Sequence, residues 1–454
     1  MRAVRRRTWA LGWLAALALV FGCAPSAPPG DKGEPGKATP AASADKTIRV
    51  VRNVGGREGF KRHWEAWQAA FEKANPGWTL ELINVGDSAA TEFYKSRIAS
   101  GDLPEVIQTW SLTKFLADNG HIVPLPDEYF TKFGMPLPTP YKGKRYATMG
   151  GLQVIGMAVN RKAWQSIGIT EPPATWAAFT AALDKLAAKG TRPMTYGAQD
   201  WCAAFPLTAL LHVNLYPYST ADPDPAKPSF TLLRDQGKAT FAGEPTAKRI
   251  LERVIALVTK YAGKGVLSDG YEESKRDFYG GGSATWLMGC WIGGDLEPNN
   301  VTTEVAYWPL PALADRPPIF VTGSSLQTGW AITTSATGEK QAKALAACEA
   351  LYDPATYQAW LNGEAMLATA TKVADVTGPQ TEHPVAKAFV ADLAANVKRY
   401  GTTRGAMRSI DDQWPQGFED ACQRLMQNVL TGERDSAKLL GELDKAWDTA
   451  RKSK

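Results

Sequence analysis

A chain of 454 residues is too long for one compact core and long enough for two or three domains. Hydrophobic residues make up 44% of it and charged residues 21%, which excludes a wholly disordered chain, a collagen-like fibre and a small disulfide-stapled domain. Arginines within the first seven residues account for four of the five net positive charges, so the remainder implies no nucleic-acid or membrane-surface partner.

The N-terminus predicts export from the cytoplasm. An arginine-rich start precedes the apolar run Trp9–Phe21, which is too short for a permanent span but has the length of a signal-peptide core. The end of the run and the two residues after it read Val20-Phe21-Gly22-Cys23, which resembles a bacterial lipobox. We therefore expect residues 1–22 to be a lipoprotein signal peptide and Cys23 to be lipidated. An ordinary secretory signal, cleaved shortly after Cys23, is the alternative.

Residues 23–46 are expected to form a disordered tether that begins at the lipidated cysteine. Ala, Pro, Gly and Ser fill 16 of the 23 positions from 24 to 46, and none of the 23 is aromatic or a large aliphatic residue. Such a segment buries too little apolar surface to order itself. A lipid, a tether and a folded body together predict a protein anchored to the outer face of the bacterial cytoplasmic membrane.

Strand and helix signals alternate from Thr47 onward. Short strands are expected at 48–51, 79–85 and 106–108, with amphipathic helices between them around 60–71 and 91–100. This order predicts a parallel α/β sheet. Later helices with the same apolar spacing are expected around 176–186, 250–261 and 439–447.

The sequence offers little catalytic or metal-binding chemistry. It has four histidines, none in zinc-binding spacing, and no CxxC, phosphate-loop, nucleophile-elbow or dinucleotide-binding motif. Neighbouring carboxylates at Glu272-Glu273 and Asp411-Asp412 diverge on a helix, so they indicate solvated surface. His63, on the polar flank of a helix, is also expected to be solvated. We expect no enzyme, no metal and no cofactor.

Several passages resemble those of one protein family, in order and spacing. Ile98–Val106 is similar to an "ASGDLPDV" passage, and Pro173–Trp176 to "P.TW". Phe278 with Gly281–Trp291 resembles "F..GKAAM.LMGNW", although Thr285 stands where methionine is usual. The resemblance spans about residues 47–450. It is to the extracellular solute-binding proteins (family 1, maltose and multiple-sugar type) of bacterial carbohydrate ABC transporters.

This resemblance implies a two-lobe α/β fold of the periplasmic-binding-protein type (class II), with three hinge crossings and a sugar in the cleft. Each lobe would be a mostly parallel sheet flanked by helices. Carried onto this chain, the N-terminal lobe is 47–152 plus 306–366, and the C-terminal lobe is 153–305 plus 367–454. The resemblance further implies a monomer that delivers its sugar to a membrane permease and its ATPase.

Tryptophan is unusually abundant, with 16 residues, and some of these indoles are candidate sugar contacts. A pyranose packs its C–H face on an indole and needs polar partners for its hydroxyls. Four tryptophans lie at expected loop ends beside polar residues or glycine: Trp110, Trp201, Trp291 and Trp414. Four others, on periodic helix faces, are expected in the core: Trp64, Trp67, Trp176 and Trp447.

Polar partners for the hydroxyls are expected beside these indoles. Gln108, Asp200 and Asp295 flank the chosen tryptophans in the sequence. Arg57 and Glu58 open the first helix, in a turn that matches a ligand-contacting "GGE" turn of the family. In the alternative interpretation, Arg57 and Glu58 only cap and solvate that helix.

Three questions stay open at this point. The first is the function, because two alternatives to a sugar-binding protein remain. They are an extracellular carbohydrate-active enzyme and a binding protein for a non-sugar solute. The number of sugar units is undetermined. Cys202 and Cys290 are able to form a bridge in an oxidising exterior, as are Cys348 and Cys422, and buried free thiols are the alternative.

Overall fold

The computed structural model describes residues 45–452, except for 56, 87–88, 138–139, 216–229, 312–317, 323–328, 404–413 and 416. Cys23, the predicted signal peptide and all but the last two residues of the predicted tether lie outside the described residues. The lipid anchor and its tether therefore stay predictions.

The first sheet contains four strands in the order β2-β1-β3-β9. Strand β1 (Thr47–Arg52) pairs in parallel with β2 (Thr79–Asn84) and with β3 (Val106–Gln108). Helices α1 (Glu58–Ala74) and α2 (Ala90–Ser100) connect these strands, so the predicted order of elements is confirmed. Strand β9 (Trp330–Ile332) comes from far along the chain and pairs antiparallel with β3.

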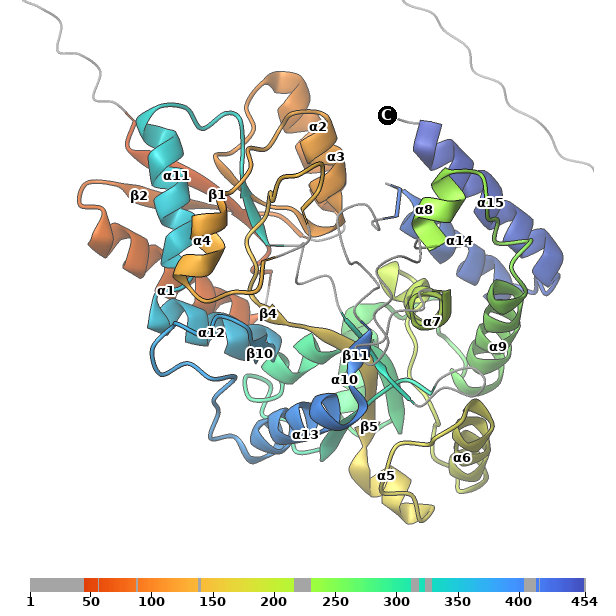
Figure 1. Cartoon of the computed structure of the whole chain (residues 1–454). Coiled ribbons are helices and arrows are strands. Elements are labelled where there is room, and N and C mark those ends of the chain that lie inside the picture. Colours follow the sequence, from red (N-terminus) through yellow and green to blue (C-terminus); the bar gives the residue numbers. More distant parts are fainter. Residues whose placement is uncertain are drawn as a thin grey trace, which may run out of the picture. The chain divides into compact units, whose positions relative to one another are not determined.

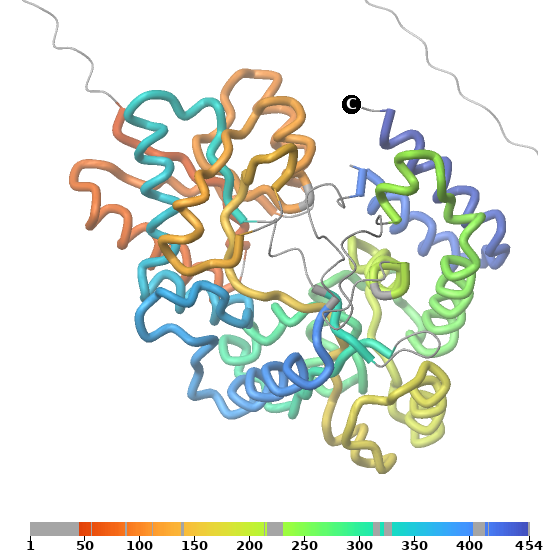
Figure 2. The backbone as a smooth tube through the Cα atoms, in the orientation of Figure 1, coloured from red at the N-terminus to blue at the C-terminus, as the bar shows by residue number. Residues whose placement is uncertain are grey.

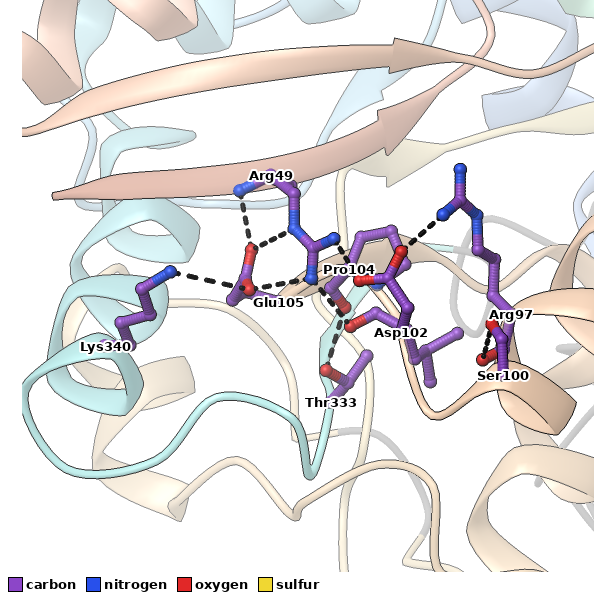
Figure 3. Close-up of polar contacts among 9 residues, drawn as sticks. Arg49, Arg97, Ser100, Asp102, Pro104, Glu105, Thr333 and Lys340 are labelled. Atoms are coloured by element: carbon purple, nitrogen blue, oxygen red, sulfur yellow. Dashed lines mark hydrogen bonds and ion pairs between the residues drawn. The ribbon is translucent and has the colours of Figure 1, made fainter. Parts of the chain in front are cut away.

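A charge network accounts for the acidic residues of the Ile98–Val106 passage (Figure 3). Glu105 is 3% exposed and accepts hydrogen bonds from the backbone N–H and Nε of Arg49, at 2.8 and 3.1 Å. Arg49 Nη1 reaches Asp102 Oδ1 at 2.5 Å, and Lys340 of α11 (Glu339–Ala350) lies 3.9 Å from Glu105. The two carboxylates thus fasten β1 to the α2–β3 loop and to α11.

The second sheet is built around β5 (Val154–Asn160). It pairs antiparallel with β6 (Thr285–Gly289), with β7 (Val305–Trp308) and with β8 (Phe320–Thr322). Only β11 (Thr402–Thr403), beside β8, adds a parallel pair to the described part of this sheet. The sheet is therefore mixed, which corrects the expectation of a mostly parallel sheet in each lobe.

Helices surround both sheets (Figure 1). Between β3 and residue 235 they also include α3 (Thr113–Asp118), α4 (Asp127–Lys132), α5 (Arg161–Ser166), α6 (Trp176–Ala188), α7 (Phe205–Leu215) and α8 (Phe230–Asp235). In the C-terminal half they include α9 (Pro245–Tyr261), α10 (Tyr271–Tyr279), α12 (Pro354–Glu364), α13 (Pro384–Tyr400), α14 (Phe418–Leu430) and α15 (Ser436–Lys452). Side chains of Asn160 and Thr175 cap α5 and α6 by accepting from backbone N–H groups, which fixes where these helices begin.

A short antiparallel pair joins segments that lie between the two sheets in the sequence. Strand β4 (Gly151–Leu152) precedes β5 directly and pairs with β10 (Leu367–Ala368), which follows α12. Figure 2 traces the backbone through both segments. A Cβ on Gly150 would lie 2.4 Å from the Trp360 ring, and one on Gly151 would lie 2.6 Å from the Leu367 carbonyl oxygen. These glycines serve close packing here.

The division into lobes stays a prediction. Core residues around the first sheet cluster with α1, α11 and α12, and those around the second sheet with α6, α7, α9, α14 and α15. Since β7 and β8 both pair with β5, residues 305–308 and 320–322 lie in the second sheet. This pairing favours a return to the first sheet after residue 322, instead of the expected boundary at 306.

Burial tests several of the sequence expectations. Trp64, Trp67 and Trp447 are buried as predicted, and Trp330 is buried in the same core as Trp67. His63 is fully buried, which contradicts the expectation of a solvated side chain. Its ring stacks nearly parallel to the rings of Trp67 and Trp360, at centroid distances of 5.9 and 5.3 Å.

The four cysteines that the structure describes are free, so neither proposed bridge forms. Each thiol is buried, and burial raises the pKa of Cys290 to about 12. A thiol kept protonated in this way is a poor nucleophile, so Cys290 acts as a small apolar side chain.

Candidate functional site

An exposed indole with aromatic support lies beside the second sheet. Trp201 begins the short 3₁₀ helix η3 (Trp201–Ala203) and is 36% exposed. Its ring stacks on Tyr271 with centroids 5.5 Å apart, and it meets Phe205 edge-on at 5.6 Å. Trp291 lies 6.4 Å from Trp201 and 5.9 Å from Phe205. We call Trp201, Phe205, Tyr271 and Trp291 the aromatic platform.

Asp200 holds two parts of the platform together. Its Oδ1 accepts a hydrogen bond from the Cys202 N–H at 3.0 Å, and its Oδ2 accepts one from the Tyr271 N–H at 2.7 Å. The carboxylate therefore ties the start of η3 to the start of α10. This geometry favours a positioning role for Asp200 over the predicted contact with sugar hydroxyls.

Trp291 is set in place by glycines. It lies in the 3₁₀ helix η4 (Cys290–Asp295), directly after β6. A Cβ on Gly289 would lie only 1.9 Å from the Trp291 ring, so the indole rests against bare backbone. Further along, a Cβ on Gly294 would lie 2.2 Å from the Gly363 carbonyl oxygen of α12. Glycine at these positions lets η4 pack directly on its neighbours.

Two other predicted site residues, Arg57 and Asp295, pair with each other. Arg57 Nη2 donates to the Trp291 carbonyl oxygen at 3.3 Å, and Arg57 Nε lies 3.5 Å from Asp295 Oδ2. Lys275 Nζ approaches the same oxygen at 3.7 Å, and Asp295 is 3% exposed. Two cations thus compensate one buried carboxylate. The cluster joins the turn after β1 to the segment that carries Trp291.

Trp110 has an unusual backbone at the end of β3. Its φ is +42°, in the left-handed region that side chains other than glycine rarely adopt. The indole is half-buried, and its ring centroid lies 6.1 Å from that of Tyr94. Strain of this kind persists only where the surrounding structure enforces it, and such positions are enriched at binding sites.

A small cavity of about 20 Å³ brings polar groups from three segments together. Gln108 ends β3, Gln153 lies between β4 and β5, and Glu364 ends α12. The indoles of Trp330 and Trp360 line the same cavity. A space of this size admits about one water molecule.

Glu58 and Trp414 lie in surroundings that suit structural roles. Glu58 is exposed and pairs with Arg62 at 3.4 Å, one turn along α1. Trp414 stacks on His212 at 4.3 Å and meets Phe418 edge-on at 5.1 Å. It lies four residues before α14 begins, so it packs against the core of the second sheet.

Several residues of this region were not expected from the sequence. Phe205 and Tyr271 complete the platform, Lys275 shares Asp295 with Arg57, and Gln153 and Glu364 line the cavity. Gly270 directly precedes Tyr271, and a Cβ there would lie 2.7 Å from Asp200 Oδ2. This glycine was therefore a weak sequence signal for a close contact beside Tyr271. The other four have no local motif that would have marked them.

The described ranges contain neither a candidate metal site nor a candidate membrane span. Within these ranges, no group of three or more His, Cys, Asp or Glu side chains is arranged to hold a metal ion. No helix there has the length and apolar character needed to cross a membrane.

Comparison with solved structures reveals the same fold in sugar-binding proteins. A chitin oligosaccharide binding protein superposes with a TM-score of 0.74 at 21% identity, over 90% of this chain and 99% of the other. RafE in complex with raffinose gives 0.67 at 18% identity, over 89% and 99%. Maltose-bound MalE3 of T. maritima gives 0.67 at 16% identity, over 89% and 99%. These likenesses confirm the periplasmic-binding-protein type of fold.

Sequence comparison gives the family directly. No match was found among curated proteins. A family model described as bacterial extracellular solute-binding protein matches residues 66–396. The model is that of family 8, whereas the sequence resemblance pointed to family 1, so the resemblance is confirmed at the level of extracellular solute-binding proteins. With most of its length matched, the chain belongs to the bacterial extracellular solute-binding proteins.

Proposed function

We propose that the protein captures a sugar outside the cytoplasmic membrane and delivers it to an ABC importer. Membership of a family of binding proteins makes it a non-enzymatic component of transport. The observation that carries the sugar assignment is the aromatic platform. Its indole Trp201 is exposed, backed by Tyr271 and flanked by Trp291, which suits stacking against the C–H face of a pyranose.

Polar groups around the platform support the same ligand class. The Tyr271 hydroxyl is buried and makes no hydrogen bond to any residue that the structure describes. Lys275 Nζ lies 5.3 Å above the Tyr271 ring. A polyhydroxylated ligand supplies both the donors and the acceptors that such groups need, which an apolar ligand does not.

Similar structures support a sugar in particular. The solved relatives bind chitin oligosaccharide, raffinose and maltose, according to their descriptions. These three ligands are all saccharides, with sugar rings and many hydroxyls. We propose that this chain takes a mono- or oligosaccharide of the same general chemistry.

Anchoring and delivery complete the proposal. Lipidation at Cys23 would hold the protein at the outer face of the cytoplasmic membrane, within reach of a permease and its ATPase. The proposed sugar contacts are Trp110, Trp201 and Trp291, with Gln108 as a polar partner. Three further residues would affect binding indirectly, by holding the platform in place: Arg57, Asp200 and Asp295. Glu58 and Trp414 stay predictions with weaker geometric support.

A ligand screen tests this function. The purified protein is heated with members of a panel of mono- and oligosaccharides, and with oligopeptides and polyamines as competing classes. A sugar at about 100 times its Kd should stabilise the fold by ~2.7 kcal/mol. Stabilisation by a peptide or polyamine, with no response to any sugar, would overturn the sugar assignment. Sugar hydrolysis during the assay would instead indicate an enzyme.

A further inference from the structure

The cavity between Gln108, Gln153 and Glu364 has a defined hydrogen-bonding character. Gln153 donates its side-chain N–H to Glu364 Oε2, and Trp360 Nε1 donates to Glu364 Oε1 at 3.3 Å. Gln153 and Glu364 are 8% and 9% exposed, so this arrangement is buried. The network fixes the carboxylate of Glu364 in one orientation at the cavity wall.

Gln108 adds an acceptor that no described residue satisfies. Its Oε1 is buried and accepts no hydrogen bond from any residue that the structure describes. A buried acceptor left without a donor is destabilising, so a donor from outside the described residues is favoured. Among the described residues, the cavity wall therefore combines an amide oxygen without a donor and a negative carboxylate.

This chemistry selects the kind of group that fits. An anionic group would be repelled by Glu364, and an apolar group would leave the Gln108 oxygen unsatisfied. A hydroxyl donates one hydrogen bond and is close to the size of the water that a 20 Å³ cavity admits. A hydroxyl on a ligand would replace that water at little cost.

The cavity is joined to the aromatic platform through Cys290. The Val154 N–H, next to Gln153, donates to Cys290 Sγ at 3.4 Å, and Cys290 Sγ lies 3.9 Å from the Glu364 carbonyl oxygen. Cys290 immediately precedes Trp291 of the platform. The segment that carries Trp291 is thus in contact with the two segments that carry Gln153 and Glu364.

We propose that Gln108, Gln153 and Glu364 form a hydroxyl-binding subsite, which recognises one particular hydroxyl group of the bound sugar. The proposal rests on the sugar-binding function above and deepens it, since it names residues that set ligand specificity. Gln108 Oε1 would accept a hydrogen bond from the ligand's hydroxyl, and the Gln153–Glu364 pair would hold the remaining wall of the subsite in place. A sugar that lacks this hydroxyl would leave the buried oxygen unsatisfied and be rejected.

The test combines deoxy sugars with a side-chain substitution. For a sugar shown to bind, Kd is measured by titration calorimetry together with each of its monodeoxy analogues. In the unaltered protein, one deoxy position should weaken binding at least about tenfold. In Gln108→Leu, the sugar itself should bind about tenfold more weakly, and the penalty at that one deoxy position should largely vanish.

Two further variants make the result specific. Gln68→Leu replaces a half-buried glutamine of α1 that bonds to Glu72 and to the Leu80 carbonyl oxygen, and it should leave every deoxy penalty unchanged. Glu364→Gln keeps the shape of the cavity and should reduce the same deoxy penalty as Gln108→Leu. If Gln108→Leu does not fold, Gln108→Asn shortens the side chain while keeping the amide.

The outcomes separate this subsite from the function on which it depends. If no sugar binds at all, the sugar-binding function itself fails. If a sugar binds, and every deoxy penalty is the same in the unaltered protein, the Gln108 variant and Glu364→Gln, the subsite is wrong while the function stands. A deoxy penalty abolished by the Gln108 variant, and retained in Gln68→Leu, supports the subsite.

Discussion

Trp201 is the single residue on which the proposed site depends most. Its indole is exposed, yet its orientation is fixed by Tyr271 beneath it and Phe205 beside it. Trp201→Ala should weaken sugar binding roughly ten- to a hundredfold, which is about 1.4–2.8 kcal/mol. Because the residue is 36% exposed, thermal stability should fall by less than for a fully buried indole. Calorimetric titration and a melting curve give the two quantities.

Trp447→Ala is the matched control for Trp201→Ala. Trp447 is buried in the core of the second sheet, and its loss should lower the free energy of unfolding by about 3–5 kcal/mol. Affinity for sugar in the remaining folded protein should be unchanged. Equal losses of affinity in both variants would contradict the separation of platform and core indoles.

His63 makes stability depend on pH. Burial, and then the charge of Arg52, lower the pKa of its imidazole well below the usual 6.5. Trp67, Trp330 and Trp360 surround the ring, and none of them carries a charge. Below pH 6.5, His63 is protonated in the unfolded chain but stays neutral in the folded chain. The free energy of unfolding should therefore fall by up to about 1.4 kcal/mol for each pH unit below 6.5.

Urea unfolding between pH 7.5 and 4.5 measures this contribution. The stability that neutral His63 maintains is fully present above pH 6.5 and is lost as the pH falls below it. His63→Phe removes the titrating group and should flatten the profile in that range. His121→Phe, at a half-buried histidine elsewhere, serves as the control. A profile that is as steep in His63→Phe as in the unaltered protein would refute this assignment.

Sequence reasoning identified some platform residues and missed others for a physical reason. Trp201 and Trp291 were found because a bulky indole beside polar residues or glycine is visible within a few positions of the chain. Phe205 and Tyr271 were missed because their role comes from contacts made across the fold, not from their neighbours. Arg57 and Asp295 were expected to face a ligand, and only the folded chain reveals that they pair with each other.

At the level of elements, local signals were the more reliable ones. The alternation from β1 to β3 was predictable because each strand and helix is specified by its own apolar spacing. Strand β9 was not, since its place beside β3 depends on a pairing between residues more than 200 positions apart. The antiparallel strands around β5 were missed for the same reason, because a buried strand has the same apolar run in either orientation.

The packing of η4 gives a prediction at the level of one element. Gly289→Ala places a methyl group where the Trp291 ring lies, so either the indole or the end of β6 must move. The substitution should cost about 1–3 kcal/mol of stability and weaken sugar binding, with a shifted tryptophan emission. Gly441→Ala on α15, where the structure leaves open space, should instead be neutral or slightly stabilising. If Gly289→Ala binds sugar with unchanged affinity, Trp291 does not contact the sugar.

The contact between Arg57 and Asp295 is a second property of η4. Arg57→Gln leaves the buried Asp295 carboxylate with Lys275 alone, and should lower the free energy of unfolding by about 3 kcal/mol. Arg57→Gln combined with Asp295→Asn should cost less than the two single changes added together, because the second change removes the uncompensated charge. Urea unfolding of the four proteins gives the coupling energy, and strictly additive losses would show that the pair is not coupled.

For the whole molecule, the proposed contacts predict a change of conformation on binding. Gln108 ends strand β3 of the first sheet and Trp110 follows it, whereas Trp201 and Trp291 lie beside the second sheet. A sugar that touches both groups binds best when they are closest, so it shifts the population towards a closed form by as much as its differential affinity allows. A transporter that recognises the closed form would then respond only to loaded protein.

Distance measurements between the two sheets test this movement. Spin labels at Glu92 on α2 and at Lys248 on α9 occupy exposed positions outside the proposed site. A saturating sugar should shorten the distance between them, and the same concentration should shorten it less in Trp201→Ala, because fewer molecules are loaded. Gly150 and Gly151 are tightly packed, so bending is expected in the segments that flank them. A distance that does not change at saturation would place the whole binding site within one lobe and refute closure.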